Sequence, residues 1–171
     1  FDQFIEYARQ EQQERQTIAN LNPLITELTD ARNTNQQFNP SAADRQSIHL
    51  ELNPLPNIPL RKVALKRVLD NLIENAFRYG SNHIEITTYF DKKQNRVICK
   101  VRDFGQGIPE DSLENVFRPF SQGDSARNSG GSGLGLAITK RIIEMHGGQI
   151  NLRNHPEEGL IAEFWLPSEG L

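Results

Sequence analysis

The segment "NLIENAFRYG" (Asn71–Gly80) ends the clearest helix that the sequence predicts, which begins near Arg61. Four apolar residues in this helix have the spacing of a single face: Leu65, Leu69, Leu72 and Ala76. Asn71 and Asn75 are one turn apart, so both amides project from one side. Gly80 favours the end of the helix. We therefore predict a helix that buries one apolar face and offers two amide groups to a ligand.

Strands and further helices alternate around this helix. Five segments alternate apolar and polar residues as strands do: "SIHLELNPLP" (47–56), "HIEITTYF" (83–90), "RVICKVRDF" (96–104), "QINLRN" (149–154) and "LIAEFWLP" (160–167). The turn "DKKQN" joins the second and third as a hairpin, and we expect the last two to pair antiparallel. Further helices are predicted near 109–116, over "LGLAITKRIIEMHGG" with Gly147 as its stop, and after a short strand near Thr17, with Asn22 as cap and Pro23 at the first helical position. This order is α+β, with helices on one face of a mixed, mostly antiparallel sheet.

Length and composition narrow the class of protein. A chain of 171 residues suits one domain, and its formal charge of -3 gives no basic surplus for nucleic acid. No apolar run approaches the ~20 residues that cross a bilayer. The single cysteine, Cys99, excludes an internal disulfide and a thiolate metal cluster, and its alternating surroundings predict burial. Because the first residue is not Met, we expect further segments upstream.

Several known nucleotide-binding motifs are excluded because the required residues are missing or occur in the wrong order along the chain. "VALK" (63–66) and Asp103-Phe-Gly look like the lysine strand and DFG turn of eukaryotic protein kinases, yet no His-Arg-Asp lies between them and the glycine-rich segment follows them. Lys66 also falls inside the predicted helix. "GGSGLGLAITK" lacks the Gly-Lys-Ser/Thr of a P-loop, and no strand precedes it as a dinucleotide fingerprint requires.

The same residues nevertheless suit the parts of a nucleotide. The amide oxygen of Asn75 is a neutral hard ligand for Mg²⁺ carrying a triphosphate, because this metal keeps its waters and needs few protein ligands. Asp103 ends a predicted strand, where a carboxylate can accept a hydrogen bond from adenine's exocyclic amine. Gly131, Gly133 and Gly135 open a predicted helix, whose free N–H groups favour phosphate. Each feature alone also fits a solvated helix face or an ordinary turn, so their conjunction carries the hypothesis.

Four motifs occur together in one order: "NLIENAFRYG", "DFGQGIP" (103–109), "FRPF" (117–120) and "GGSGLGLAI" (130–138). On these residues the sequence resembles the ATP-binding catalytic domain of bacterial sensor histidine kinases, with its N, G1, F and G2 boxes, from about Thr17 onward. The resemblance implies the Bergerat fold, a two-layer α/β sandwich, with ATP and Mg²⁺ as cofactors. It also implies that residues 1–16 end a dimerisation helix and linker, and that residues 17–171 form the ATP-binding domain with a lid near 118–132.

The resemblance implies roles for individual residues, although it gives no side chain that is certainly catalytic. Asn75 would ligate Mg²⁺ and Asn71 would support the triphosphate. Arg78 would contact phosphate and Tyr79 would lie against the adenine. Asp103 would recognise the exocyclic amine of the adenine. Phe117 and Phe120 would anchor the lid. Further ATP contacts are expected at Gly105, Gly107, Ile108, Phe120, Gln122, Gly123, Arg127, Gly131, Ser132, Gly133, Leu134, Gly135 and Leu136. An osmosensing member of the family has a basic residue where this chain has Gln122. Arg127 is expected to supply the positive charge instead.

Asn71 separates relatives that share the fold. Gyrase-type ATPases carry a glutamate there, four residues before the metal asparagine, as general base for water, and an amide cannot take a proton. Glu74 points about 100° away from Asn75 and is predicted to be a surface residue. We therefore predict a domain that holds ATP without hydrolysing it quickly, and the resemblance implies that it donates the γ-phosphoryl group of ATP. The alternatives are an ATP-gated ATPase of the gyrase or chaperone class and a non-catalytic interaction module.

No histidine of the chain has the context of a phosphorylated histidine. His49 and His83 lie in or beside strands, His155 lies in a turn, and His146 ends a helix, where a cation would suit the helix dipole. The acceptor is therefore expected on a histidine-bearing dimerisation domain before Phe1, with a response regulator as final recipient. The resemblance also implies a monomeric isolated domain, a homodimeric full-length protein and a cytoplasmic position in an inner-membrane sensor.

Overall fold

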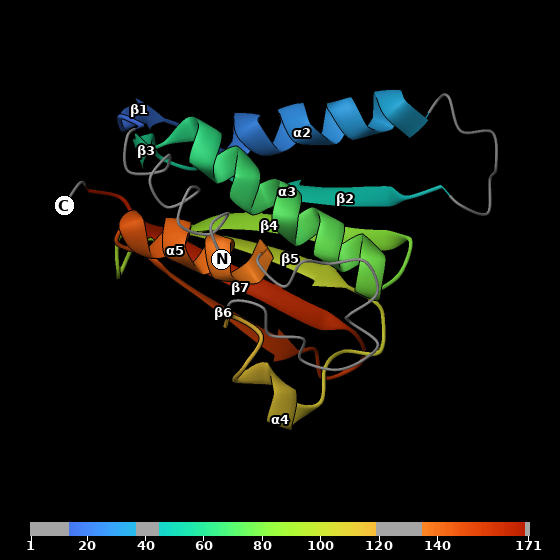
Figure 1. The fold of residues 1–171 in the computed structure, drawn as a ribbon. Helices are drawn as coiled ribbons and strands as arrows, with labels where there is room; N and C mark the ends of the chain where they lie inside the picture. Colours follow the sequence, from blue (N-terminus) through green and yellow to red (C-terminus); the bar gives the residue numbers. More distant parts are fainter. Residues whose placement is uncertain (1–13, 37–44, 119–134, 170–171) are drawn as a thin grey trace.

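The sheet of the computed structural model has one face covered by helices (Figure 1). The structure describes residues 14–36, 45–118 and 135–169. Five strands lie in the order β2 (Ser47–Leu52), β4 (His83–Asp91), β5 (Arg96–Asp103), β7 (Leu160–Pro167) and β6 (Gln149–Asn154). β2 pairs parallel to β4, whereas the other three pairings are antiparallel. The predicted α+β class, the mostly antiparallel sheet and both antiparallel strand pairs are confirmed.

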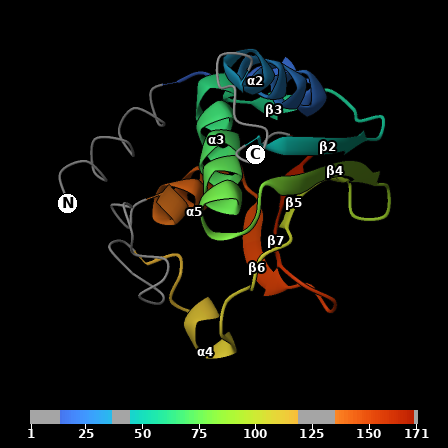
Figure 2. The same ribbon diagram turned by 90° about the vertical axis from the view of Figure 1, so that its right-hand side faces the viewer.

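The helices form the second layer. α2 (Leu21–Gln36), α3 (Lys62–Tyr79) and α5 (Gly135–Met145) lie against the same face of the sheet, with α3 between the other two (Figure 2). The short α4 (Glu110–Leu113) lies away from this layer. None of the described helices combines the length and apolar character that a membrane span needs.

The core lies between the two layers. The predicted apolar face of α3 is buried along its whole length, and it meets residues that alternate along the strands, as a sheet with one covered face requires. Cys99 is fully buried among them, and this burial raises the pKa of its thiol to about 12. The thiol is therefore a packing group, as its sequence context predicted.

A second, two-stranded sheet was not predicted. β1 (Thr17–Ala19) pairs antiparallel with β3 (Ile58–Leu60), and Pro59 stands opposite Ile18. Proline cannot donate to a strand ladder, so it fits only an edge position such as this two-stranded sheet offers. The prolines of residues 54–59 argue against a strand, so the sequence did not predict β3.

The cap of α2 is Asn20, so the prediction that Asn22 caps this helix is wrong. The backbone N–H of Asn22 donates to Asn20 Oδ1 over 3.0 Å, and the helix already includes Leu21. The Asn22 side chain instead donates to the Asn53 carbonyl at 2.8 Å and accepts from Thr88 Oγ1 at 2.8 Å. These tertiary partners explain why the earlier asparagine takes the capping position.

The start of α3 is held by residues that are distant in sequence. The Glu14 carboxylate accepts from the N–H groups of Val63 at 2.8 Å and Ala64 at 3.0 Å, and the Glu14 carbonyl accepts from Arg61 Nε at 2.9 Å. The Arg61 N–H donates to His146 Nε2 at 3.0 Å. N–H groups that a helix start leaves without an intrahelical partner are thus satisfied by other elements.

His146 is neutral, so the end of α5 does not carry the cation that the helix dipole would favour. Its side chain is 3% exposed, and burial lowers its pKa below the usual 6.5. Because Nε2 accepts a hydrogen bond, Nδ1 carries the proton and donates it to the Ile142 carbonyl at 2.8 Å. A buried acceptor position thus outweighs the attraction of the helix dipole for a cation.

Candidate functional site

Asn71 joins the second half of α3 to the start of α5. Its side chain is half-buried, and its Nδ2 donates to the Gly135 carbonyl at 3.2 Å and to Thr139 Oγ1 at 3.3 Å. Two of the motifs that the sequence singles out, one around Asn71 and one around Gly135, are therefore neighbours in space.

Asn75 lies one turn further along α3. Its side chain is half-buried, and the described part of the chain gives its amide no hydrogen-bond partner. Arg78 is exposed and Tyr79 is half-buried in the last turn. Glu74, on the exposed side, forms an ion pair with Arg32 at 2.6 Å, so it is a surface residue as predicted.

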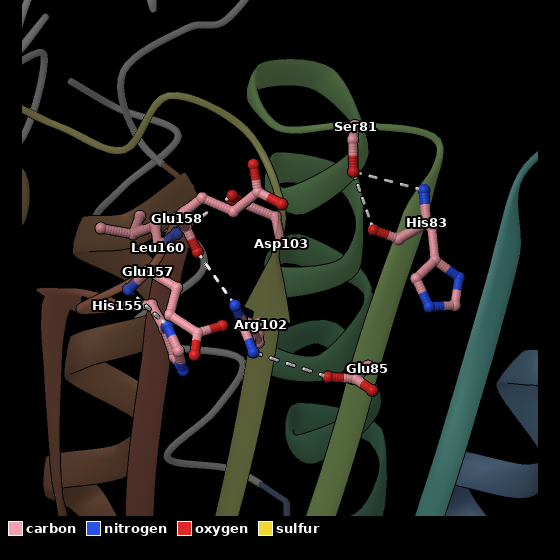
Figure 3. Close-up of polar contacts among 9 residues, drawn as sticks. All are labelled: Ser81, His83, Glu85, Arg102, Asp103, His155, Glu157, Glu158 and Leu160. Atoms are coloured by element: carbon pink, nitrogen blue, oxygen red, sulfur yellow. Dashed lines mark hydrogen bonds and ion pairs between the residues drawn. The ribbon is translucent and has the colours of Figure 1, made fainter.

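Asp103 ends β5 with a fixed carboxylate. Only 2% of the residue is exposed, and its Oδ1 accepts from the N–H groups of Gly105 at 3.0 Å and Leu160 at 3.1 Å. Figure 3 shows Asp103 at this strand end beside Leu160. Two backbone donors on one oxygen set the orientation of the carboxylate, which suits it to read one donor of a ligand.

The end of α3 touches the end of β5 through glycine backbones. A Cβ on Gly105 would lie 2.5 Å from the Gly80 Cα, and a Cβ on Gly80 would lie 2.5 Å from the Asp103 Cβ. Gly107 has φ 77°, and a Cβ there would meet Asn154 Oδ1. The sequence predicts Gly105 and Gly107 as ATP contacts, and the structure shows that close contacts within the protein itself require glycine at both positions.

Asn154 and Arg102 support this turn, and sequence reasoning missed both. Asn154 Oδ1 accepts from the Ile108 N–H at 2.9 Å, and its Nδ2 donates to the Ile108 carbonyl at 2.7 Å. Arg102 donates to the Glu158 carbonyl at 3.2 Å (Figure 3). Its guanidinium group also lies 4.2 Å from the Phe104 ring centroid. His83 stacks on the same ring at 5.4 Å. Apart from the contact between Arg102 and Phe104, which are two residues apart, these contacts join segments that are distant in sequence, so they have no local sequence signal.

The remaining predicted residues divide into two groups. Leu136 is half-buried next to Gly135, and Ile108 is buried. Phe117 packs against the main core and against a smaller apolar cluster formed by Ile108, Val116 and Leu160. The other predicted contacts lie outside the described residues: Phe120, Gln122, Gly123, Arg127, Gly131, Ser132, Gly133 and Leu134.

The described groups fit a nucleotide carrying Mg²⁺. No set of three or more histidine, cysteine or acidic side chains could hold a metal in the described ranges, so a dedicated protein cage is absent there. A metal held mainly by phosphate and water needs only a ligand such as the Asn75 amide oxygen. The Asp103 carboxylate supplies an oriented acceptor, and the start of α5 supplies backbone donors for an anion.

Comparison with known proteins shows which family the chain resembles. Residues 61–170 match the family model described as histidine kinase-, DNA gyrase B-, and HSP90-like ATPase. The alginate biosynthesis sensor protein KinB of Pseudomonas aeruginosa is 40% identical over 145 residues, which cover 84% of this chain and 23% of KinB. The catalytic domain of the histidine kinase ThkA has a TM-score of 0.75 at 28% identity, and the match covers 90% of this chain and 96% of that domain.

The osmosensor EnvZ of E. coli is a further relative. The solution structure of its histidine kinase domain has a TM-score of 0.64 at 32% identity, over 90% of this chain and 89% of that one. The chain spans about a quarter of the length of curated relatives such as KinB. The chain belongs to the family of histidine kinase-, DNA gyrase B- and HSP90-like ATPases, and it is homologous to the sensor histidine kinases within that family.

Proposed function

We propose that this chain is the ATP-binding part of a protein histidine kinase, which donates the γ-phosphoryl group of ATP to a histidine on a dimerisation domain. The observation that carries the proposal is the contact of α3 with α5 at Asn71, 3.2 Å from the Gly135 carbonyl. This contact brings the amides of α3, which suit a metal, to the helix start that suits phosphate.

Each residue would act by holding one part of the substrate. Asp103 would accept a hydrogen bond from the adenine amine, because two backbone donors already orient its carboxylate. Asn75 would ligate Mg²⁺ through its amide oxygen, and Arg78 would contact phosphate from the last turn of α3. Bound ATP and Mg²⁺ supply the transferable phosphoryl group and neutralise its charge. Catalysis by this domain would therefore rest on positioning the γ-phosphoryl group.

The gyrase or chaperone alternative is less well supported. A fast ATPase of that class needs a carboxylate to take a proton from water, and position 71 holds an amide. The adjacent acid, Glu74, is engaged by Arg32 on the exposed side of α3. A domain without this base holds ATP until an acceptor arrives, as a phosphoryl donor must.

The partners of the full-length protein follow from its relatives. ThkA has been solved in complex with the response regulator TrrA, and that kinase matches 98% of this chain with a TM-score of 0.73 and 28% identity. We propose that the phosphohistidine of the full-length protein likewise passes its phosphoryl group to a response-regulator aspartate. We also propose that the full-length protein is a homodimeric inner-membrane sensor with this domain in the cytoplasm.

Calorimetric titration of the 171-residue chain with AMPPNP, with Mg²⁺ and with EDTA, tests the binding step. γ-labelled ATP and a separate histidine-bearing dimerisation domain then test transfer. Label on the acceptor histidine is the expected result. Steady phosphate release without labelling would favour the ATPase class, and absence of AMPPNP binding would leave only an interaction module.

The same titration tests how the base is read. Asp103→Asn replaces one of the two acceptor oxygens by a donor, so we expect affinity for adenine nucleotides to fall about tenfold while affinity for guanine nucleotides changes little. Equal weakening of both nucleotides would contradict a role of Asp103 in base recognition.

A further inference from the structure

Thr139 is a fully buried polar residue on the apolar side of α5. It has 0% exposure, and its buried neighbours along the helix are Ala137, Ile138, Ile142 and Ile143. A hydroxyl group in such a place destabilises the fold unless it forms a hydrogen bond. Its partner is Asn71 Nδ2 at 3.3 Å, on the neighbouring helix α3.

The chemistry of the two acceptors fixes the orientation of the Asn71 amide. The Gly135 carbonyl, at 3.2 Å, can only accept, so the NH₂ group of Asn71 must face α5. Gly135 and Thr139 are one helical turn apart, and their oxygens receive one N–H each from the same amide. The amide nitrogen is then committed to α5, and the oxygen is the polar atom of this side chain that is left for a ligand.

We propose that Thr139 is a positioning residue, which holds the Asn71 amide so that it offers its oxygen, and not its NH₂ group, to the nucleotide site. This inference rests on the proposed function. An amide oxygen repels phosphate oxygens but accepts hydrogen bonds from water, and Mg²⁺ bound to a triphosphate keeps several of its waters. Asn71 therefore serves the hydration shell of the metal, beside its direct ligand Asn75.

Removal of the Thr139 hydroxyl takes away one of the two acceptors. Thr139→Val keeps the shape of the side chain but leaves only the Gly135 carbonyl to accept from the Asn71 amide, so the amide can turn. The loss of one neutral hydrogen bond corresponds to a loss of affinity of about 2- to 10-fold, and this loss should occur only with Mg²⁺. A purely structural link between α3 and α5 would weaken binding equally with Mg²⁺ and with EDTA.

The experiment is calorimetric titration of the 171-residue chain with AMPPNP in Mg²⁺ and in EDTA. T139V should lose affinity only in Mg²⁺, whereas T139S should stay within about twofold of the unaltered chain because it keeps the hydroxyl. Thr29→Val is the matched control, since Thr29 is a buried helical threonine that donates to the Ile25 carbonyl at 2.9 Å on α2. T29V should change neither affinity.

Three outcomes would overturn the role of Thr139: no loss of affinity in T139V, an equal loss in Mg²⁺ and EDTA, or the same loss in T139S. If T139V does not fold, T139A against T139S gives the same comparison, since both lack the methyl group and differ by the hydroxyl. In the nucleotide-free chain, the side-chain NH₂ protons of Asn71 should exchange more slowly with solvent than in T139V. Failure of the unaltered chain to bind AMPPNP would instead overturn the proposed function itself.

Discussion

Helix α3 is held in different ways at its two ends. At its start, Glu14 and His146 accept hydrogen bonds from three backbone N–H groups of residues 61–64. In its second half, Asn71 is bonded to α5, whereas the Asn75 amide has no partner among the described residues. The chain thus satisfies one end of the helix with its own groups and leaves the amides that we propose bind the ligand at the other.

The sharpest way to test this contrast is to remove the unpartnered amide. Asn75→Ala should lower the Mg²⁺-dependent affinity for AMPPNP by about 100-fold or more, because it deletes the proposed metal ligand, while the melting temperature stays nearly the same. Calorimetry and thermal unfolding measure the two effects.

Glu74→Ala is the matched control for Asn75→Ala. It alters the adjacent, exposed position, whose ion pair with Arg32 contributes little, so affinity should stay within about twofold. If N75A retained full affinity, the second half of α3 would not hold the metal.

The second test disturbs the contact between the ends of α3 and β5. Gly105→Ala places a Cβ 2.5 Å from the Gly80 Cα, so we expect the free energy of unfolding to fall by about 1–3 kcal/mol. Gly135→Ala is the control for stability, since its Cβ would lie 3.9 Å from the Asn71 Cγ, an ordinary contact. Urea unfolding measures both, and a fully stable G105A would show that the two backbones can separate.

The third test removes the distant cap at the start of α3. Glu14→Ala deletes two charge-assisted hydrogen bonds to helix N–H groups, and the free energy of unfolding should fall by about 1–2 kcal/mol. Glu27→Ala removes only an exposed ion pair with Lys66 at 3.0 Å and should cost about 0.5 kcal/mol or less. Equal stability of E14A and E27A would mean that Glu14 does not anchor the helix.

The smallest effect is expected from pH. Burial lowers the pKa of His146 in the folded chain, so below pH 6.5 the unfolded chain binds the proton more readily than the folded chain does. Neutral His146 therefore makes its full contribution to the free energy of unfolding above pH 6.5, and this contribution declines as the pH falls below 6.5. Arg61 lowers the same pKa further, while Glu14 and the Ile142 carbonyl oppose the shift.

Urea unfolding between pH 8 and 5 should show this decline for the unaltered chain. His146→Gln has no group that titrates there, so its decline should be smaller. His49→Gln, which changes an exposed histidine, is the control and should leave the slope unchanged. A slope that persists in H146Q would assign the decline to other groups.

Patterns repeated along the chain made most of the fold predictable. The spacing of Leu65, Leu69 and Leu72 identifies α3, and alternation identifies all five strands of the main sheet. β3 was not predicted because Pro59 argues against a strand. The cap of α2 was assigned to the wrong residue because two asparagines near the helix start could both serve as the cap. Local signals therefore fail where tertiary partners decide between nearby alternatives.

The site was predictable only for residues whose types suggest chemistry. Asn71, Asn75 and Asp103 could be singled out from sequence because amides and a carboxylate occur at helix and strand positions that suit a ligand. Asn154 and Thr139 could not, since they act through partners 46 and 68 residues away. Sequence reasoning thus singles out the groups that we propose face a ligand more readily than the groups that we propose orient them.

Because Glu14 is attached to the start of α3, a small tilt of the helix there produces a larger displacement at its far end. Asn75 lies 12 residues beyond Val63, which corresponds to about 18 Å along the axis. A tilt of about 3° around the anchored start would therefore move Asn75 by about 1 Å. A displacement of this size at a reacting centre can change a rate by about 100-fold. A shift of the backbone at Glu14 would thus move the proposed metal ligand Asn75 without any direct contact with it.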